Sequence, residues 1–198
     1  MNGHLGREGL GGAGLPDDVI DAARQLLGWR LSTAFGGVVT ALVIVETEAY
    51  GGADDPASHA YRGQTKRNTS MYLPSGTLYV YRSYGIHWCA NVVTGPAGEA
   101  SAVLVRGGVP VAGIELMRER RGRPDHLADG PGKLCAALGI SGAHDGASLE
   151  LGPVRLLPPT SPDPIQVDVG RRVGISQAVD RPWRFVARGI EGSSLAST

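Results

Sequence analysis

The sequence predicts one compact domain of mixed α and β structure. A length of 198 residues is typical of a single domain, and 42% hydrophobic against 19% charged residues can form a buried core. Runs with helical spacing of apolar residues occur among strand-like, β-branched runs. The 30 glycines have no triplet period, so they indicate many turns rather than collagen. We expect the domain over 15–198, after a flexible Gly-rich tail over 1–14.

The first two elements are a helix over 16–27 and a strand over 38–50. Pro16 suits the first turn of a helix, Asp17 and Asp18 lie at its positive end, and the following apolar residues have helical spacing. The strand is expected because the run VVTALVIVETEAY is β-branched and has few polar residues in its first half.

A long loop and three strands are expected next. Residues 51–75 are rich in Gly, Asp, Ser and Pro, and loops of this length in compact domains are usually functional. TLYVYR (77–82) and HWCANVV (87–93) indicate two strands joined by a tight turn over 83–85, and another strand is expected over 102–107.

Two short helices and further strands complete the chain. We expect a basic helix over 114–121 and a short second helix over 131–138, which is entered through Gly-Pro-Gly at 130–132. Residues 150–188 return to strand-like runs and Pro-rich turns. There is no internal repeat and no clear domain boundary.

The formal charge is zero overall but unevenly distributed. Residues 1–59 hold three Arg against eight acidic residues, whereas 60–123 hold eight Arg and one Lys against three acidic residues. Of the 19 basic residues 17 are Arg, which suits bidentate contact with phosphate. All six tyrosines lie between Tyr50 and Tyr84, and rings interleaved with Arg suit base stacking. The alternatives are a solvated basic surface and tyrosines that only form strands.

The composition also bears on the cellular location of the protein and on the presence of disulfides or a zinc site. No run approaches the roughly 18 apolar residues of a membrane span, and the first ten residues have no signal-peptide core. The two cysteines, Cys89 and Cys135, are too few for a disulfide framework or a four-ligand zinc site. We therefore expect a cytoplasmic protein without a membrane partner, and nothing in the sequence calls for a metal.

Two carboxylates are candidates for catalysis. Strand alternation places Glu46, Glu48 and Tyr50 on one face at the end of the predicted strand. Carboxylates there are costly to bury unless paired, and a desolvated Glu is a plausible general base. The alternative is a pair of carboxylates in salt bridges to the excess Arg.

Three other features carry weaker signals. Tyr84 lies in the expected hairpin turn, where a projecting ring suits insertion between bases. His59 lies in a loop, where most residues are solvated. The Gly-rich helix start at 130–132 could present N–H groups to phosphate with Lys133 adding charge, although taken alone this pattern favours an ordinary helix start. Leu134 replaces the Ser or Thr of a P-loop.

Several blocks in sequence closely resemble the alkyladenine, or 3-methylpurine, DNA glycosylase family. They run over about 16–190, and their shared order and spacing are more specific than any one block. The blocks are VETEAY (45–50), His59 eleven residues after Glu48, QTKRN (64–68), GTLYVYRSYGIHWCAN (76–91), VLVR (103–106) and GPGKLCAALGI (130–140). The resemblance implies an α+β domain with a curved antiparallel β-sheet, a protruding β-hairpin and surrounding helices.

The resemblance also implies roles for single residues. Glu48 matches the general base that activates water, Arg106 matches the arginine near the target phosphate, and Val173, in RVGI, matches a segment whose backbone helps to hold that water. The pocket for a flipped base would be lined by Tyr50, His59, Tyr81 and Asn91. Contacts to DNA would come from Tyr84, Arg67, Arg82, Ile86, His87 and Lys133, with Tyr84 filling the gap in the duplex.

The implied activity is that of a monofunctional, monomeric glycosylase of base excision repair, without cofactor or metal. Its partner would be double-stranded DNA that contains damaged purines, and its products a free base and an abasic site. Asn91 would crowd the exocyclic amine of normal guanine. His87 departs from relatives that carry Tyr at this position.

Two other classes of function remain open at this point. A non-catalytic nucleic-acid binding protein could use the same aromatic and basic surface, and Glu48 would then be dispensable. A hydrolase of small nucleosides or glycosides could use Glu46 and Glu48, but it would need neither the Arg excess nor the hairpin Tyr84.

Overall fold

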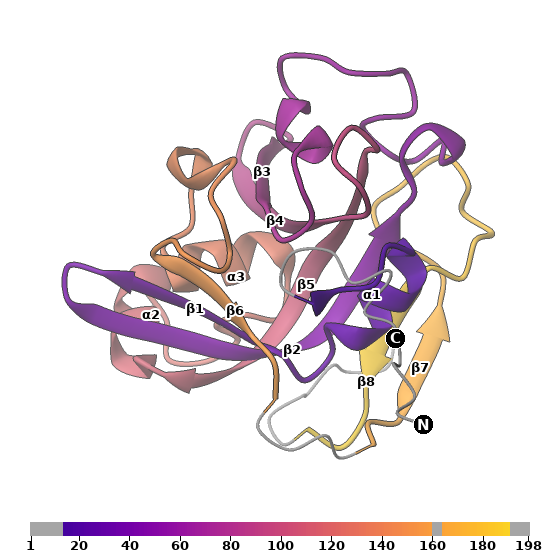
Figure 1. Cartoon of the computed structure of the whole chain (residues 1–198). Coiled ribbons are helices and arrows are strands. Elements are labelled where there is room, and N and C mark those ends of the chain that lie inside the picture. Colours follow the sequence, from indigo (N-terminus) through magenta and orange to yellow (C-terminus); the bar gives the residue numbers. More distant parts are fainter. Residues whose placement is uncertain (1–13, 160–163, 191–198) are drawn as a thin grey trace, which may run out of the picture.

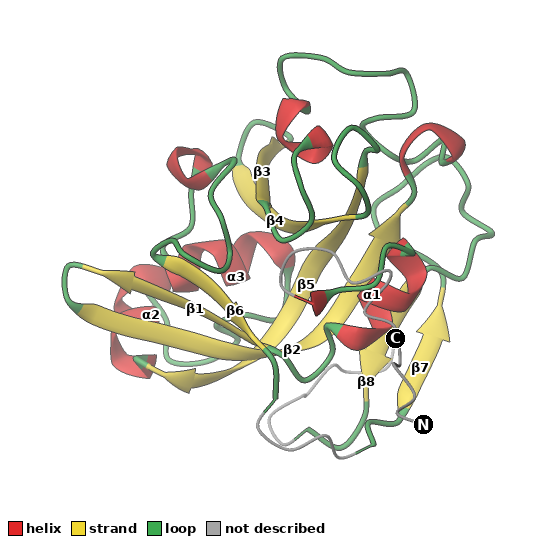
Figure 2. Ribbon diagram, viewed as in Figure 1, coloured by secondary structure: helices red, strands yellow, loops and turns green. Residues whose placement is uncertain are grey.

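A single curled antiparallel sheet organises residues 14–159 and 164–190, which the computed structural model describes (Figures 1 and 2). Among these residues eight strands pair in the order β3-β4-β5-β2-β1-β6, with β8 paired to both β2 and β7. The strands are β1 (Arg30–Phe35), β2 (Val38–Tyr50), β3 (Leu78–Ser83), β4 (His87–Thr94), β5 (Ser101–Ala112), β6 (Val154–Leu157), β7 (Val167–Gly170) and β8 (Arg184–Ala187). The expected tail, except Gly14, lies outside the described residues.

Strand β2 is the centre of the sheet. One of its edges pairs with β5 along most of its length, whereas the other pairs first with β1 and then, from Glu46 to Glu48, with β8. Paired on both edges and buried along most of its length, β2 is a near-continuous apolar run until its last residues. Glu46 and Glu48, near that end, therefore lie on a strand that is hydrogen-bonded along both of its edges.

Two bulges interrupt the pairing of β2 with β5 near those carboxylates. Ile44 and Glu46 of β2 pair with the adjacent residues Gly108 and Gly107 of β5, so β2 has one extra residue at the first bulge. At the second bulge, directly after Glu46, the extra residue belongs to β5. Arg106 is the extra residue of that second bulge. Since bulges re-aim side chains and bend strands, they direct Arg106 toward the end of β2.

The helices cover the sheet at separate places. They are α1 (Val19–Gln25), α2 (Ile114–Arg121) and α3 (Pro131–Leu138). Asp18 caps α1, since its carboxylate accepts the N–H groups of Ile20 and Asp21, at 2.8 and 2.9 Å. Helix α1 contacts β2 and β5, while α3 contacts β4, β5 and α2.

The structure confirms the predicted strand 38–50, the two strands around the 83–85 turn and both later helices. The curled antiparallel sheet implied by the resemblance is also confirmed. The first helix is shorter than 16–27, because only Val19–Gln25 follows the Asp18 cap. The strand over 102–107 extends to Ala112, past Pro110.

One strand was not predicted at all. Strand β1, RLSTAF, has few β-branched residues, and it is a strand because it pairs with β2 on one edge and β6 on the other. The long loop after β2 contains two short 3₁₀ helices, η2 (Gly52–Asp54) and η3 (Thr69–Tyr72), and a third, η4 (Gly142–His144), follows α3.

Candidate active site

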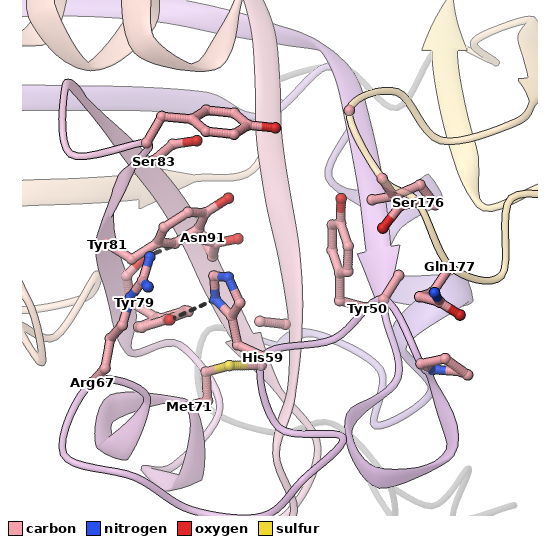
Figure 3. A pocket seen from close by; sticks show the side chains of 16 residues that line it. Tyr50, His59, Arg67, Met71, Tyr79, Tyr81, Ser83, Asn91, Ser176 and Gln177 are labelled. Atoms are coloured by element: carbon pink, nitrogen blue, oxygen red, sulfur yellow. Dashed lines mark hydrogen bonds between the residues drawn. The ribbon is translucent and has the colours of Figure 1, made fainter.

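A cavity of about 480 Å³ opens between the end of β2, the long loop, the β3–β4 hairpin and the segment 174–177. This volume lies within the range of small-molecule sites. Its walls are largely aromatic and polar, with these principal residues: Tyr50, His59, Arg67, Met71, Tyr79, Tyr81, Tyr84, Asn91, Ser176 and Gln177 (Figure 3).

Three aromatic side chains form facing walls of this cavity. Tyr50 lies on one side, and His59 and Tyr81 lie on the other (Figure 3). The rings of His59 and Tyr81 meet edge to face, with centroids 4.5 Å apart and an angle of 86° between their planes. A flat, purine-sized ring could therefore stack between Tyr50 and the opposite wall.

A hydrogen bond to Tyr79 holds His59 in place. The His59 Nδ1 and the Tyr79 hydroxyl are hydrogen-bonded at 2.9 Å, and Tyr79 is 1% exposed. Burial, aided by the positive charge of Arg67, lowers the pKa of His59 below its ordinary value. At neutral pH the imidazole is therefore uncharged, and it would not repel a cationic ring in the cavity.

Asn91 lines the same cavity with its amide held in place. The side-chain N–H₂ donates to the Tyr79 carbonyl at 3.1 Å, and the residue is 3% exposed. A buried amide with a fixed partner does not rotate away from an incoming group. The position is suited to steric discrimination among bases.

Glu48 lies directly behind the Tyr50 wall, fully buried. Its carboxylate accepts three hydrogen bonds: the Tyr50 hydroxyl at 2.9 Å, an Arg106 Nη1–H at 3.3 Å and the Val173 backbone N–H at 2.6 Å. It does not itself line the cavity and reaches it through Tyr50. Arg106 and Val173, both far along the sequence, thus meet the Glu48–Tyr50 pair of β2 at one carboxylate.

The pKa of the Glu48 carboxyl is raised above its ordinary value. Burial is the main cause, and the nearby charge of Glu46 adds to it. The Arg106 charge, the Val173 N–H and the Tyr50 hydroxyl act in the opposite direction but do not cancel the burial. A carboxylate that is desolvated yet held by three donors has the properties of a tuned general base.

Glu46 has a different environment. Its carboxylate binds Arg106 Nε at 3.0 Å and Arg184 Nε at 2.5 Å. The two carboxylates therefore have different partners, and each fits a different one of the two interpretations of the pair. Glu46 is a salt-bridge partner of two guanidinium groups, whereas Glu48 pairs with one of them and also contacts the cavity wall.

The hairpin tip beside the cavity is strongly exposed. Tyr84 is 87% exposed, with φ of 48°, and Gly85 has φ of 69°. The Ile86 N–H donates to the Ser83 carbonyl at 2.9 Å, so two central residues with positive φ close the turn, as in type I′ hairpins. A large side chain in this conformation is uncommon and is held by the hairpin around it.

The remaining predicted DNA contacts surround the cavity or lie outside it. Arg67 lines the cavity, lies 5.9 Å from the centre of the Tyr81 ring and donates to the Arg82 carbonyl at 3.0 Å. Ile86 and His87 are exposed beside Tyr84. Lys133, on α3, is paired with Asp129 at 3.0 Å and is not part of the cavity lining.

Sequence reasoning missed the groups that support this site. Asp55 and Arg172 form a buried ion pair next to Val173, and Trp183 packs against Arg172. A lone Asp in a Gly-rich loop and one Arg in a basic stretch give no sign of burial. The only available signal was the position of Arg172 beside Val173 in the quoted RVGI block.

Within residues 14–159 and 164–190, neither a membrane-spanning helix nor a metal-binding cluster occurs. No helix there has the length and apolar character that a bilayer crossing requires. Nor do three or more His, Cys, Asp or Glu side chains come together there in a way that could hold a metal ion.

Comparison with known proteins gives consistent matches over nearly the whole chain. The family model described as methylpurine-DNA glycosylase matches residues 14–191. A protein of Agrobacterium fabrum is 51% identical over 184 residues, which cover 91% of this chain and 88% of that protein. Proteins of Nitrosospira multiformis (48% identical; 90% and 88% covered) and Methanoculleus marisnigri (49%; 87% and 91%) are similar. All three are named, provisionally, as 3-methyladenine DNA glycosylases.

Proposed function

The chain belongs to the methylpurine-DNA glycosylase family, and we propose that it excises alkylated or deaminated purines from duplex DNA. As a DNA glycosylase, it is a hydrolase of N-glycosyl bonds with a role in DNA repair. The observation that carries the proposal is the Glu48 carboxylate, held by Tyr50, Arg106 and the Val173 N–H behind a base-sized aromatic cavity.

The first step of the proposed mechanism is extrusion of the damaged nucleotide. A base inside a duplex is out of reach, and damaged or poorly paired bases cost least to unstack. Tyr84, exposed at the hairpin tip, would fill the gap that the base leaves. The extruded purine would then stack between Tyr50 and the His59–Tyr81 wall, where electron-rich faces favour an alkylated, cationic ring.

The second step is cleavage of the N-glycosidic bond. Alkylation makes the base a better leaving group. Glu48 takes a proton from a water that attacks C1′, and its negative charge stabilises the oxocarbenium character of the sugar. Arg106 and the Val173 N–H keep the carboxylate oriented. The C1′–N bond breaks with its electron pair going to the base, and the water oxygen bonds to C1′. The proton taken by Glu48 passes to solvent when a cationic alkylated base leaves, and to the departing base when that base is uncharged. The products are a free base and an abasic site.

We further propose how normal bases are excluded, what the reaction requires and where the protein acts. The fixed Asn91 amide would crowd the exocyclic amine of normal guanine. In the reaction as proposed, Glu48 activates the attacking water, and neither a metal nor a cofactor takes part. We also propose that the protein acts as a monomer on nucleoid DNA in the cytoplasm. Cys89 and Cys135 are buried and form no disulfide, which fits a reducing compartment.

Base release from defined substrates tests this proposal. We expect release from duplex oligonucleotides that carry 3-methyladenine, 7-methylguanine, hypoxanthine or an etheno adduct, and none from the corresponding free nucleosides. The measurement is chromatography of the released base. Release from free nucleosides would favour the small-nucleoside hydrolase instead. Tight lesion binding without any release would favour a non-catalytic binding protein.

The pH dependence follows from the environment of Glu48. A general base must be ionised, so lowering the pH through its pKa protonates it and stops the reaction. Because burial raises that pKa, we expect the single-turnover rate to fall on the acid side with a midpoint above the ordinary value of 4.5. A pH–rate profile on one lesion duplex measures the midpoint. A rate that stays constant down to pH 4.5 would contradict the assignment.

A further inference from the structure

Arg172, the residue before Val173, forms a fully buried ion pair with Asp55. The side chains of Arg172 and Asp55 are both 0% exposed. Arg172 Nη1–H donates to Asp55 Oδ2 at 2.5 Å and to the Ala49 carbonyl at 2.9 Å, and Nη2–H donates to Asp55 Oδ1 at 2.8 Å. One guanidinium therefore links the end of β2, the long loop and the segment that carries Val173.

Asp55 is itself held by the backbone of its loop. Its carboxylate accepts the Gly51 N–H and the Ala57 N–H, both at 3.2 Å. Burial alone would raise the pKa of this carboxyl, but the hydrogen bonds and charge of Arg172 hold it below the ordinary value. The group is therefore an ionised, fully bonded anchor.

The Arg172 guanidinium also packs against two aromatic rings. The Arg172 guanidinium carbon lies 4.8 Å from the centre of the Tyr50 ring and 5.1 Å from that of Trp183. Trp183 is in turn joined to β2, since its carbonyl accepts the Ala49 N–H at 2.9 Å. Arg172 thus packs against Tyr50, one of the three donors to Glu48, and immediately precedes Val173, which provides another.

We propose that Arg172 and Asp55 are positioning residues for the glycosylase reaction. Their buried ion pair keeps the Val173 N–H and the Tyr50 ring in the places from which both groups orient the Glu48 carboxylate. The inference rests on the proposed function, because it takes Glu48 to be the general base.

Physical considerations favour positioning over simple stabilisation. A buried ion pair contributes little net stability, since desolvation of the two ions offsets most of their attraction. Its geometric effect is large, because a bidentate guanidinium fixes direction as well as distance. The pair is not needed to fill the core, which is apolar and made largely by other elements.

The acid side of the pH–rate profile can report on this positioning. The groups that face Glu48 are Glu46 and Tyr50 of β2, Arg106 of β5 and the Val173 N–H; Arg184 of β8 faces Glu46. Removing Arg172 and Asp55 together leaves the net charge near Glu48 unchanged. If Val173 then moves away, Glu48 loses a donor that lowers its pKa, and the midpoint must shift upward.

The test compares the double variant Arg172→Met/Asp55→Leu with wild type in single-turnover excision from a duplex that carries the lesion wild type excises fastest. We expect a rate lower by about tenfold to a hundredfold at neutral pH, the scale of a small misplacement in an active site. We also expect an acid midpoint at higher pH and an unchanged Kd for undamaged duplex, because both side chains are absent from the exposed surface. Arg172→Lys, which cannot make the same bidentate contact, should change in the same direction.

A matched control removes an exposed Arg–Asp pair. Arg188 and Asp168 are joined at 2.6 Å, with side chains 59% and 48% exposed, and Arg188→Met/Asp168→Leu should leave the profile unchanged. A folded double variant with the wild-type rate and midpoint would overturn the inference. Should that variant not fold, Arg172→Lys with the wild-type profile would overturn it equally.

The outcomes also separate this inference from the proposed function. If Glu48→Gln abolishes excision while the Arg172 and Asp55 variants behave as wild type, only the positioning role is wrong. If Glu48→Gln excises bases at the wild-type rate, the general-base assignment itself is wrong.

Discussion

Replacing Glu48 by glutamine is expected to lower base excision by at least roughly a hundredfold, the lower range for loss of a general base. Glutamine keeps the shape of the side chain but cannot accept a proton from water. Binding of lesion duplex should be retained, because Glu48 is fully buried and does not contribute to the exposed surface. Single-turnover excision and duplex Kd, measured on the same preparation, test both statements.

The matched control for this variant is Glu115→Gln. Glu115 lies on α2, pairs with Arg118 and has a side chain that is 85% exposed, so the same chemical change there should leave excision unaltered. Melting temperatures of both variants exclude a general loss of folding. Excision by Glu48→Gln at close to the wild-type rate would show that the water is activated by another group.

Replacing Tyr84 by serine should lower excision from duplex DNA through a loss of base flipping. A planar ring at the hairpin tip can occupy the space of the extruded nucleotide, and such a wedge offsets an unstacking cost of about a few kcal/mol. The ring is 87% exposed, so its removal should leave the core and the melting temperature unchanged. Fluorescence of a reporter base at the lesion measures the population of the extruded state.

A second exposed apolar residue provides the control for Tyr84. Leu151 is 83% exposed in the segment before β6, and Leu151→Ser should leave the flipping signal at the wild-type level. If Tyr84 were only a packed turn residue, its loss would lower the melting temperature and activity together. An unchanged flipping signal in a stably folded Tyr84→Ser protein would rule out the wedge.

The strongest local patterns of the sequence already determined much of the fold. The β-branched run of β2, the paired strands around 83–85 and the helices over 114–121 and 131–138 each carry their own propensity, and the structure confirms all of them. Strand β1 was missed because its structure depends on two neighbouring strands rather than on its own residues.

The site shows the same division. From the sequence alone, strand alternation placed Glu46, Glu48 and Tyr50 together, and the quoted blocks indicated the aromatic pocket. The difference between the two carboxylates came only from the tertiary structure. Arg184 joins Glu46 from a strand far along the chain, whereas Glu48 receives Val173. Hydrogen-bond partners more than a hundred residues apart leave no local pattern.

Two tertiary features in particular could not be read from the residues. Arg106 is directed at Glu48 because a bulge re-aims it, and a bulge depends on the register between two strands rather than on either strand alone. The Arg172–Asp55 pair spans 117 residues and is buried only because the long loop and the RVGI segment close over the end of β2. Sequence determined which side chains are available, whereas the packing of distant segments determined which of them share one desolvated space.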